Sequence, residues 1–154
     1  RIVCKATSIN NMGTRKKGLE FAKHITEIIN KSTGFESHLQ KVKIVDGGDG
    51  ACTAELKVDQ DHVNLYKFLH GGYIMTLVDL ITTYALMSKP CHPGVSVDLS
   101  VNFLNGAKLG DDVVIQANLS KVGKYLAFID CTLKHKKDDL VIAKGTHLKY
   151  IKFD

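Results

Sequence analysis

Residues 70–87 read HGGYIMTLVDLITTYALM, and this stretch decides the fold. Apolar side chains occupy every face that a helix of this sequence would present, and a helix that is apolar all round is a buried helix. We therefore predict a long helix over residues 71–87 at the centre of the protein. Two features depart from the apolar pattern: the pair of glycines at the start and the single acidic residue inside, Asp79.

Short segments with the two-residue alternation of β-strands lie on both sides of this helix. The clearest reads GVSVDLSVNFL over residues 94–104, and we expect it to form a long strand with one buried face. Gly47, Gly48 and Gly50 suit the positive φ angles of a hairpin turn. In all we expect strands over residues 42–45, 53–58, 94–104, 112–121, 125–135 and 140–151, the last four forming an antiparallel meander.

A second, amphipathic helix is predicted over residues 18–31. Its apolar residues recur at helical spacing: Leu19, Ala22, Ile25, Ile28 and Ile29. The elements add up to an α+β protein in which a curved antiparallel sheet of about six strands wraps the long central helix. A chain of 154 residues, 44% apolar and 24% charged, supplies one such core and shows no internal repeat or linker.

The charge of the chain is unevenly distributed. The formal net charge is +5, yet residues 1–43 hold nine Lys/Arg against three Asp/Glu, and the remainder is close to neutral. A nucleic-acid-binding domain carries its basic stripe on the folded body, so we expect no nucleic-acid partner. Residues 73–87 are too few to span a bilayer. We interpret residues 1–17 as a basic leader, or a disordered or non-native segment, of a cytoplasmic or mitochondrial protein.

The presence of Asp79 inside the apolar central helix needs an explanation. A carboxylate in apolar surroundings is costly unless it has a partner. No Lys or Arg occurs between Lys67 and Lys89 to neutralise it from the helix itself. Its side chain could cap a distant backbone group or point to solvent. The functional interpretation is a carboxylate kept at a cleft, where it acts as a base or a nucleophile.

His70, Gly71 and Gly72 stand directly before the helix. Two glycines at a helix N-terminus leave the unpaired N–H groups open to a ligand, and the helix dipole favours negative charge there. Such a site suits an oxyanion, although a tight entry turn would also explain the glycines. Gly71 and Asp79 are eight residues apart, about 12 Å along a helix. If both act on one substrate, Asp79 must come from a second copy, as in a two-fold dimer with antiparallel helices.

These residues carry a resemblance to a known family. PGVSVD at 93–98, GAKLGD at 106–111 and the pattern Asn64-x5-His70-Gly71-Gly72-x6-Asp79 are similar to the hotdog-fold acyl-CoA thioesterases. The resemblance spans residues 19–150 and implies that residues 18–154 are a single hotdog thioesterase domain. It also implies a homo-oligomer, a dimer that pairs into a dimer of dimers.

The resemblance implies a role for each matching residue. Asp79 would activate water for attack on a thioester, and the Gly71 N–H would polarise the thioester carbonyl. Asn64 would help to orient the water or the substrate, and Ser96 would hold the water near the carboxylate. Asn64 and Gly71 would belong to one subunit, Asp79 and Ser96 to its neighbour. His70 is a candidate base, the alternative being a structural residue that bonds nearby backbone.

The expected reaction is hydrolysis of medium- to long-chain fatty acyl-CoA to fatty acid and coenzyme A. It needs no metal, and no cofactor beyond the coenzyme A of the substrate. Coenzyme A phosphates require surface cations, and the candidates lie near the last strands: Lys121, Lys124, His147 and Lys149. An acyl tunnel could be lined by side chains of the central helix, with Met75, Tyr84 and Met87 as candidates. Packing in the core is the stronger interpretation of these side chains.

Two other functions stay open from the sequence. A hotdog dehydratase that acts on hydroxyacyl thioesters would use a histidine paired with an acid, and His70 is available for it. A non-catalytic acyl-CoA-binding module would use the same scaffold, but it would have no reason to keep Asp79.

Overall fold

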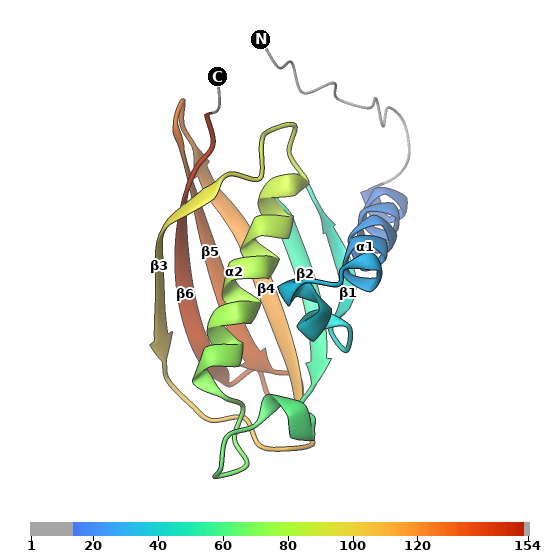
Figure 1. Ribbon diagram of the computed structural model, residues 1–154, viewed down its shortest axis with the longest axis vertical. Helices are drawn as coiled ribbons and strands as arrows, with labels where there is room; N and C mark the ends of the chain where they lie inside the picture. The colour runs from blue at the N-terminus through green and yellow to red at the C-terminus, as the bar shows by residue number, and fades with distance from the viewer. Residues whose placement is uncertain (1–13, 153–154) are drawn as a thin grey trace.

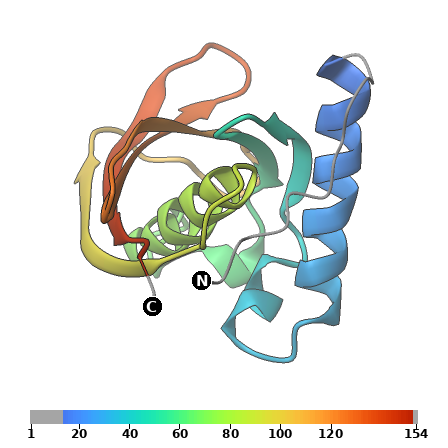
Figure 2. The ribbon, with the colours of Figure 1, turned by 90° about the horizontal axis from the view of Figure 1, so that it is seen from above.

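The computed structural model describes residues 14–152, with side chains from residue 18 onward. A six-stranded antiparallel sheet curves around one long helix, α2 (Gly71–Met87) (Figure 1). Seen from above, α1 (Thr14–Lys31) lies outside the sheet, next to the strands at one edge (Figure 2). This is the predicted α+β architecture. Residues 1–13 of the predicted leader lie outside the described residues.

The strands follow the spatial order β1-β2-β4-β5-β6-β3. Their bounds are β1 (Lys43–Gly48), β2 (Ala51–Lys57), β3 (Val95–Phe103), β4 (Asp112–Val122), β5 (Leu126–His135) and β6 (Val141–Tyr150). Two short 3-10 helices complete the chain, η1 (Phe35–Leu39) and η2 (Gln60–His62).

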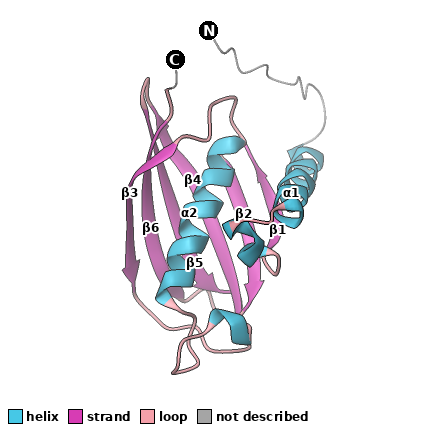
Figure 3. Cartoon of the chain, viewed as in Figure 1, coloured by secondary structure: helices cyan, strands magenta, loops and turns pink. Residues whose placement is uncertain are grey.

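The predicted meander of four consecutive strands is wrong in one respect. β3 pairs with β6 and not with β4, its neighbour in the sequence. Residues 104–111 carry the chain past the start of α2 to the other side of the sheet (Figure 3). The Leu69 N–H donates to the Ala107 carbonyl at 2.7 Å and holds this crossing in place. As a result β4 pairs with β2, and β3 is left as a free edge of the sheet.

The outer layer of the fold is α1 on the β1–β2 hairpin. Buried Ala22, Ile25 and Ile29 form the predicted apolar face of the helix, whereas Leu19 is 52% exposed. Gly47 allows the close approach, because a Cβ there would lie 2.4 Å from the ring of Phe21. α1 begins at Thr14, four residues before the predicted start.

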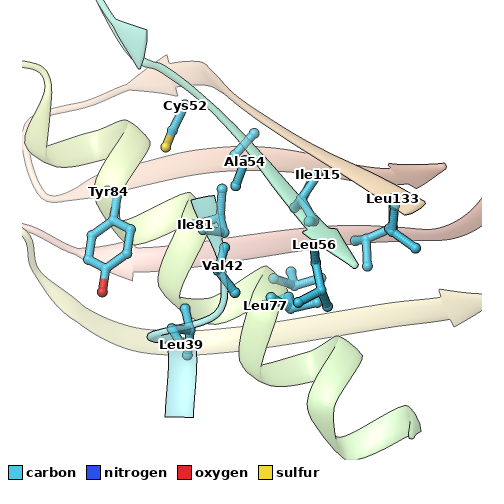
Figure 4. Close-up of a cluster of buried hydrophobic side chains, with 14 of the residues drawn as sticks. Leu39, Val42, Cys52, Ala54, Leu56, Leu77, Ile81, Tyr84, Ile115 and Leu133 are labelled. Atoms are coloured by element: carbon cyan, nitrogen blue, oxygen red, sulfur yellow. The ribbon is translucent and has the colours of Figure 1, made fainter. Parts of the chain in front are cut away.

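The main core lies between α2 and the concave face of the sheet. Leu77 and Ile81 of α2 face Leu56, Ile115 and Leu133 of the strands, and all five are at most 2% exposed (Figure 4). Burial of each such side chain contributes about 1.5–3 kcal/mol to stability. Among the described residues, no helix has the length and apolar character to cross a bilayer.

The prediction that α2 is buried on every side is wrong for the single protomer. The Asp79 side chain is 42% exposed, and Met75 is 39% exposed. The predicted buried face of residues 94–104 is wrong as well, since Val97 and Phe103 of β3 are more than half exposed. The sheet covers only one side of α2, so apolar side chains on the other side of this helix are exposed. β3 lies at the edge of the sheet with no further strand beside it, so its apolar side chains are exposed as well.

Candidate active site

The first residues of α2 are positioned by the loop that precedes them. His70 is the N-cap of the helix, and the Gly72 N–H donates to its Nδ1 at 2.9 Å. This hydrogen bond engages one of the two nitrogens of the His70 ring with the helix that the residue precedes. The Gly71 N–H lies in the first turn, where an α-helix offers no acceptor. Gly71 thus offers an N–H group of the kind that can polarise a carbonyl.

Asn64 lies in the same loop and forms an Asx turn. Its Oδ1 accepts hydrogen bonds from the N–H groups of Tyr66 at 2.9 Å and Phe68 at 3.2 Å. The carbonyl end of the amide is therefore committed to the loop, and the NH2 end can donate to a ligand. One depression of about 530 Å³ is lined by Gln60, Val63, Asn64, Leu65, Tyr66, Lys67 and His70. The structure thus brings Asn64, His70 and Gly71 together at the start of α2.

Asp79 and Ser96 meet further along α2, around a residue of β6. His147 Nε2 lies 2.9 Å from Ser96 Oγ and 3.7 Å from Asp79 Oδ1. On the other side of the ring, His147 Nδ1 lies 2.6 Å from Thr82 Oγ1. The structure therefore places Ser96 near the carboxylate, and the His147 imidazole stands between the two.

The hydrogen-bond partners of His147 assign its tautomer. The Thr82 hydroxyl has one proton, and it lies 2.7 Å from the Val78 carbonyl oxygen and 2.9 Å from that of Asp79. It therefore donates to the helix backbone and accepts from the Nδ1–H of His147. Nε2 is then an acceptor, and the Ser96 hydroxyl donates to it. The free lone pairs of Ser96 Oγ are left to accept from a water beside the carboxylate.

The prediction that His147 and Lys149 are surface cations is wrong. Their assignment to the coenzyme A phosphates depended on that exposure. Their side chains point inward from β6, with only 1% and 4% of each residue exposed. Burial, together with the positive charge of Lys149, lowers the pKa of His147 to about 4, so the imidazole is neutral at pH 7. Its approach to Asp79 is therefore not an ion pair. Lys121 and Lys124, by contrast, are exposed near the β4–β5 turn, as a phosphate contact requires.

Lys149 reaches α2 one helical turn beyond Asp79. Its Nζ donates to Thr83 Oγ1 at 2.7 Å, and that hydroxyl donates to the Asp79 carbonyl at 2.8 Å. Burial lowers the pKa of Lys149, and the negative charge of Asp79 opposes this effect. Gly145 brings β6 close enough, because a Cβ there would lie 2.6 Å from Val78 Cγ1.

Sequence reasoning missed the threonines and misread the two basic residues of this cluster. Thr82 and Thr83 follow Asp79 by three and four residues, a spacing that shares a helix face. On β6 the strand alternation puts four residues on the inward side: Ala143, Gly145, His147 and Lys149. Both signals were in the sequence, but neither says which strand packs beside Asp79.

The described residues therefore form two chemically different groups along α2. The helix start offers N–H donors suited to a developing negative charge. The group around Asp79 offers a carboxylate, a hydroxyl and a neutral imidazole suited to holding and deprotonating water. Eight residues separate Gly71 from Asp79, about 12 Å of helix. Within residues 14–152, no cluster of three or more His, Cys, Asp or Glu is arranged to hold a metal.

A curved antiparallel sheet around a long helix is the hotdog fold, and a carboxylate on the helix and N–H donors at its start are groups that thioester hydrolysis can use. The model of the family described as thioesterase superfamily matches residues 66–142, which include Gly71, Asp79 and Ser96. The chain belongs to this family.

Known proteins are similar to this chain over most of its length. Human acyl-coenzyme A thioesterase 13 is 39% identical over 130 residues, which cover 84% of this chain and 93% of the human protein. The crystal structure of zebrafish thioesterase superfamily member 2 has a TM-score of 0.84 and 38% identity, covering 88% of this chain and 99% of that one. A hypothetical thioesterase protein from Streptococcus pneumoniae, solved with coenzyme A, has a TM-score of 0.72 and 25% identity, covering 87% and 95%. The resemblance and the hotdog fold predicted from the sequence are confirmed.

Proposed function

We propose that this protein hydrolyses medium- to long-chain fatty acyl-CoA to a fatty acid and coenzyme A. The observation that carries the proposal is the Asp79 carboxylate on the open side of α2, with Ser96 Oγ and His147 Nε2 held together beside it. The human relative's name and the coenzyme A in the streptococcal structure support the substrate class. The dehydratase alternative would use the His70 ring as its base, but the Nδ1 of this ring already accepts from the Gly72 N–H.

The site is completed by a second copy of the chain. Asp79 is too far along α2 to reach a carbonyl bound at Gly71 of the same helix, at about 12 Å. A two-fold axis that sets two α2 helices antiparallel brings each Asp79 to the partner's helix start and makes two equivalent sites. One subunit then supplies Asn64 and Gly71, and the other subunit supplies Asp79 and Ser96.

The surface that would bury against the second copy is open and apolar. β3 is a sheet edge with unpaired backbone groups, and such an edge invites pairing with another strand. Three of the side chains of β3 are exposed by about half: Val95 at 53%, Val97 at 56% and Phe103 at 54%. Phe103 also lies 3.5 Å from the point where a Gly71 Cβ would stand, so this surface runs up to the helix start. Two such dimers would pair into the tetramer that the family resemblance implies.

The reaction is a direct attack of water on the thioester carbonyl. Asp79 takes a proton from the water as the water oxygen forms a bond to the carbonyl carbon. The Gly71 N–H and the helix dipole stabilise the negative charge that develops on the carbonyl oxygen. The C–S bond then breaks, and the coenzyme A thiolate leaves and takes up the proton. Ser96 orients the water, and the NH2 group of Asn64 donates to the water or the substrate.

The substrate would lie along the open side of α2 and the loop before it. Leu65 and Tyr66 are exposed beside the depression that Asn64 lines, at 96% and 82%, and we assign them to the substrate's apolar parts. Tyr84, a candidate for the acyl tunnel, is 3% exposed and belongs to the core instead. Lys121 and Lys124 remain the proposed contacts for the phosphates of coenzyme A.

We propose the cytoplasm or the mitochondrion as the compartment. Cys52 and Cys131 are buried thiols without a disulfide, and burial raises the pKa of each to about 12. Unbridged thiols are the usual state of cysteine in reducing compartments.

Release of free thiol from a panel of acyl-CoA substrates, from acetyl to palmitoyl, tests the proposal. We expect turnover that increases with chain length and a single fatty acid product for each substrate. A dehydrated acyl-CoA product from hydroxyacyl substrates would instead identify a dehydratase. Binding without thiol release would identify a carrier.

A further inference from the structure

The loop before α2 is a tight hairpin with an unusual residue at its end. Val63 and Leu69 form a β-bridge, and the Asn64 N–H donates to the Phe68 carbonyl at 2.8 Å. The Lys67 N–H donates to the Asn64 carbonyl at 3.0 Å. The three residues between Asn64 and Phe68 therefore form a three-residue hairpin loop, whose last residue takes the left-handed conformation. That residue is Lys67, with a φ of 63°.

Lysine is an unfavourable residue at this position. The left-handed conformation brings the Cβ of an L-residue too close to the following carbonyl oxygen, and hairpin loops of this kind prefer glycine there. Glycine would suit the turn better, so the turn does not account for the lysine side chain. Backbone strain of this kind is concentrated at binding and catalytic sites. The Lys67 ammonium group is therefore a candidate for binding.

Lys67 lies between two depressions beside the start of α2, at the lower end of the molecule in Figure 1. The first is the depression of about 530 Å³ that Asn64 and His70 line. The second has a volume of about 390 Å³ and is lined by Tyr66, Lys67, Phe68, Lys108 and Leu109. Tyr66 and Lys67 line both, so a molecule that begins at the start of α2 can extend across the first depression into the second.

The charged groups of these two depressions are basic. None of the described residues that line them is acidic. Lys67 Nζ donates to the uncharged Gln60 Oε1 at 3.2 Å, and Lys108 Nζ lies 5.9 Å from the centre of the Phe68 ring. Within residues 14–152, neither ammonium group forms an ion pair with a carboxylate. Two such ammonium groups in one depression suit a ligand with several negative charges, such as phosphates.

We propose that Lys67 and Lys108 bind the phosphate groups of coenzyme A, and that this contact is the reason for a lysine in the strained position. The inference rests on the proposed function in that the substrate is an acyl-CoA with its thioester at Gly71. The pantetheine part would cross the first depression, and the phosphates would reach the second. Lys121 and Lys124 lie near the β4–β5 turn at the opposite end of the sheet (Figure 1), so they would reach the same molecule only from another subunit.

Two substitutions of Lys67 separate the side chain from the backbone. Lys67→Met removes the charge and keeps the strain, whereas Lys67→Gly removes both. In each we expect KM for acyl-CoA to rise about three- to fivefold at low salt, with kcat unchanged. The melting temperature should not change in Lys67→Met and should rise by about 2–4 °C in Lys67→Gly. A lysine with only a structural role would not give a variant that is more stable and binds substrate less well.

The controls concern the ligand and the net charge. Acyl-pantetheine lacks the nucleotide and all its phosphates, so its KM should be the same in wild type and in Lys67→Met. Lys23→Met removes an exposed lysine of α1 and should leave KM for acyl-CoA unchanged. Equal KM values for acyl-CoA in Lys67→Met and Lys23→Met would overturn the inference, and so would an equal rise with acyl-pantetheine. A lower melting temperature in Lys67→Gly would contradict the strain at this residue.

Binding of free coenzyme A, measured by calorimetry, needs no turnover. Lys67→Met and Lys108→Met should each weaken it by about three- to fivefold, and Lys67→Arg should keep the wild-type affinity. Dephospho-coenzyme A lacks the 3′-phosphate: an effect that disappears with it assigns the lysines to that phosphate, and an effect that remains assigns them to the diphosphate. Unchanged affinity in both methionine variants contradicts the inference. Wild-type protein that binds coenzyme A but releases no thiol from any acyl-CoA would defeat the proposed function alone.

Discussion

The two halves of the site are held by different kinds of contact. At the start of α2, the side chains of Asn64 and His70 bond to backbone groups two to four residues away. Around Asp79, the bonds of His147 and Lys149 join residues 51 to 66 positions apart. The first half is a local structure of a loop and a helix end. The second exists only when β3, β6 and α2 are packed together.

Because of this difference, substitutions in the two halves should affect the catalytic rate and the stability of the fold to different degrees. The helix start offers donors and is mostly accessible, so changes there should alter the rate with little effect on folding. The group around Asp79 contains a buried imidazole and a buried lysine side chain. Changes there should alter the rate, the pH dependence and the free energy of unfolding together, unless they touch only Asp79 itself, which is partly exposed.

Asp79→Asn should have the largest effect. General-base catalysis contributes about 10²–10⁴-fold, and we expect kcat for acyl-CoA hydrolysis to fall by that amount. The melting temperature should stay near that of wild type, because the amide has the same shape and the site is partly open. Glu20→Gln, at an exposed carboxylate of α1, is the control. Full activity of Asp79→Asn in a thiol-release assay would remove Asp79 from the reaction.

Gly71→Pro removes one N–H and little else. Proline is favoured at the first position of a helix, and His70 already has φ −65° and ψ 133°, which suit a residue before proline. We expect kcat to fall by about 10²–10³-fold, the usual contribution of one oxyanion donor. Gly71→Ala keeps the N–H, and its Cβ would have its nearest neighbour, Phe103, at 3.5 Å. Equal losses of kcat in the two variants would show that space, and not the donor, matters at this position.

Buried His147 should make stability depend on pH. Its pKa in the folded protein, about 4, lies below the ordinary value of 6.5, so the unfolded chain binds the proton first as the pH falls. The free energy of unfolding should therefore drop by up to about 3 kcal/mol between pH 6.5 and pH 4. His147→Gln should lack this part of the slope, and His24→Gln, at an exposed histidine of α1, should keep it. Urea denaturation across this pH range measures the difference, and parallel slopes in wild type and His147→Gln would contradict it.

Lys124→Ala should have the smallest effect. An exposed charge contributes about 0.2–1 kcal/mol to an ion pair, so KM for acyl-CoA should rise by no more than about fivefold and kcat should not change. The rise should shrink at high salt, because exposed charges are screened. Steady-state kinetics at two salt concentrations give the answer. A KM that is unchanged at low salt would place the phosphates elsewhere.

Much of the fold could be predicted because its signals are local. The periodicities of α2 and of the strands depend on neighbouring residues, and so does the motif from Asn64 to Asp79. The pairing of β3 with β6 joins segments far apart in the chain, and no local pattern specifies it. For the same reason His147 and Lys149 were misread: alternation puts them on one face of a strand, but the packing of β6 on α2 makes that face the interior.

The most direct test of the shared site mixes two inactive chains. Asp79→Asn and Gly71→Pro are each expected to be nearly inactive alone. In a mixed dimer built across the two-fold axis, one site carries both changes and the other carries neither. Random mixing of equal amounts should therefore restore about a quarter of wild-type activity. If Asp79 and Gly71 of the same chain formed the site, the mixture would stay as inactive as its parts.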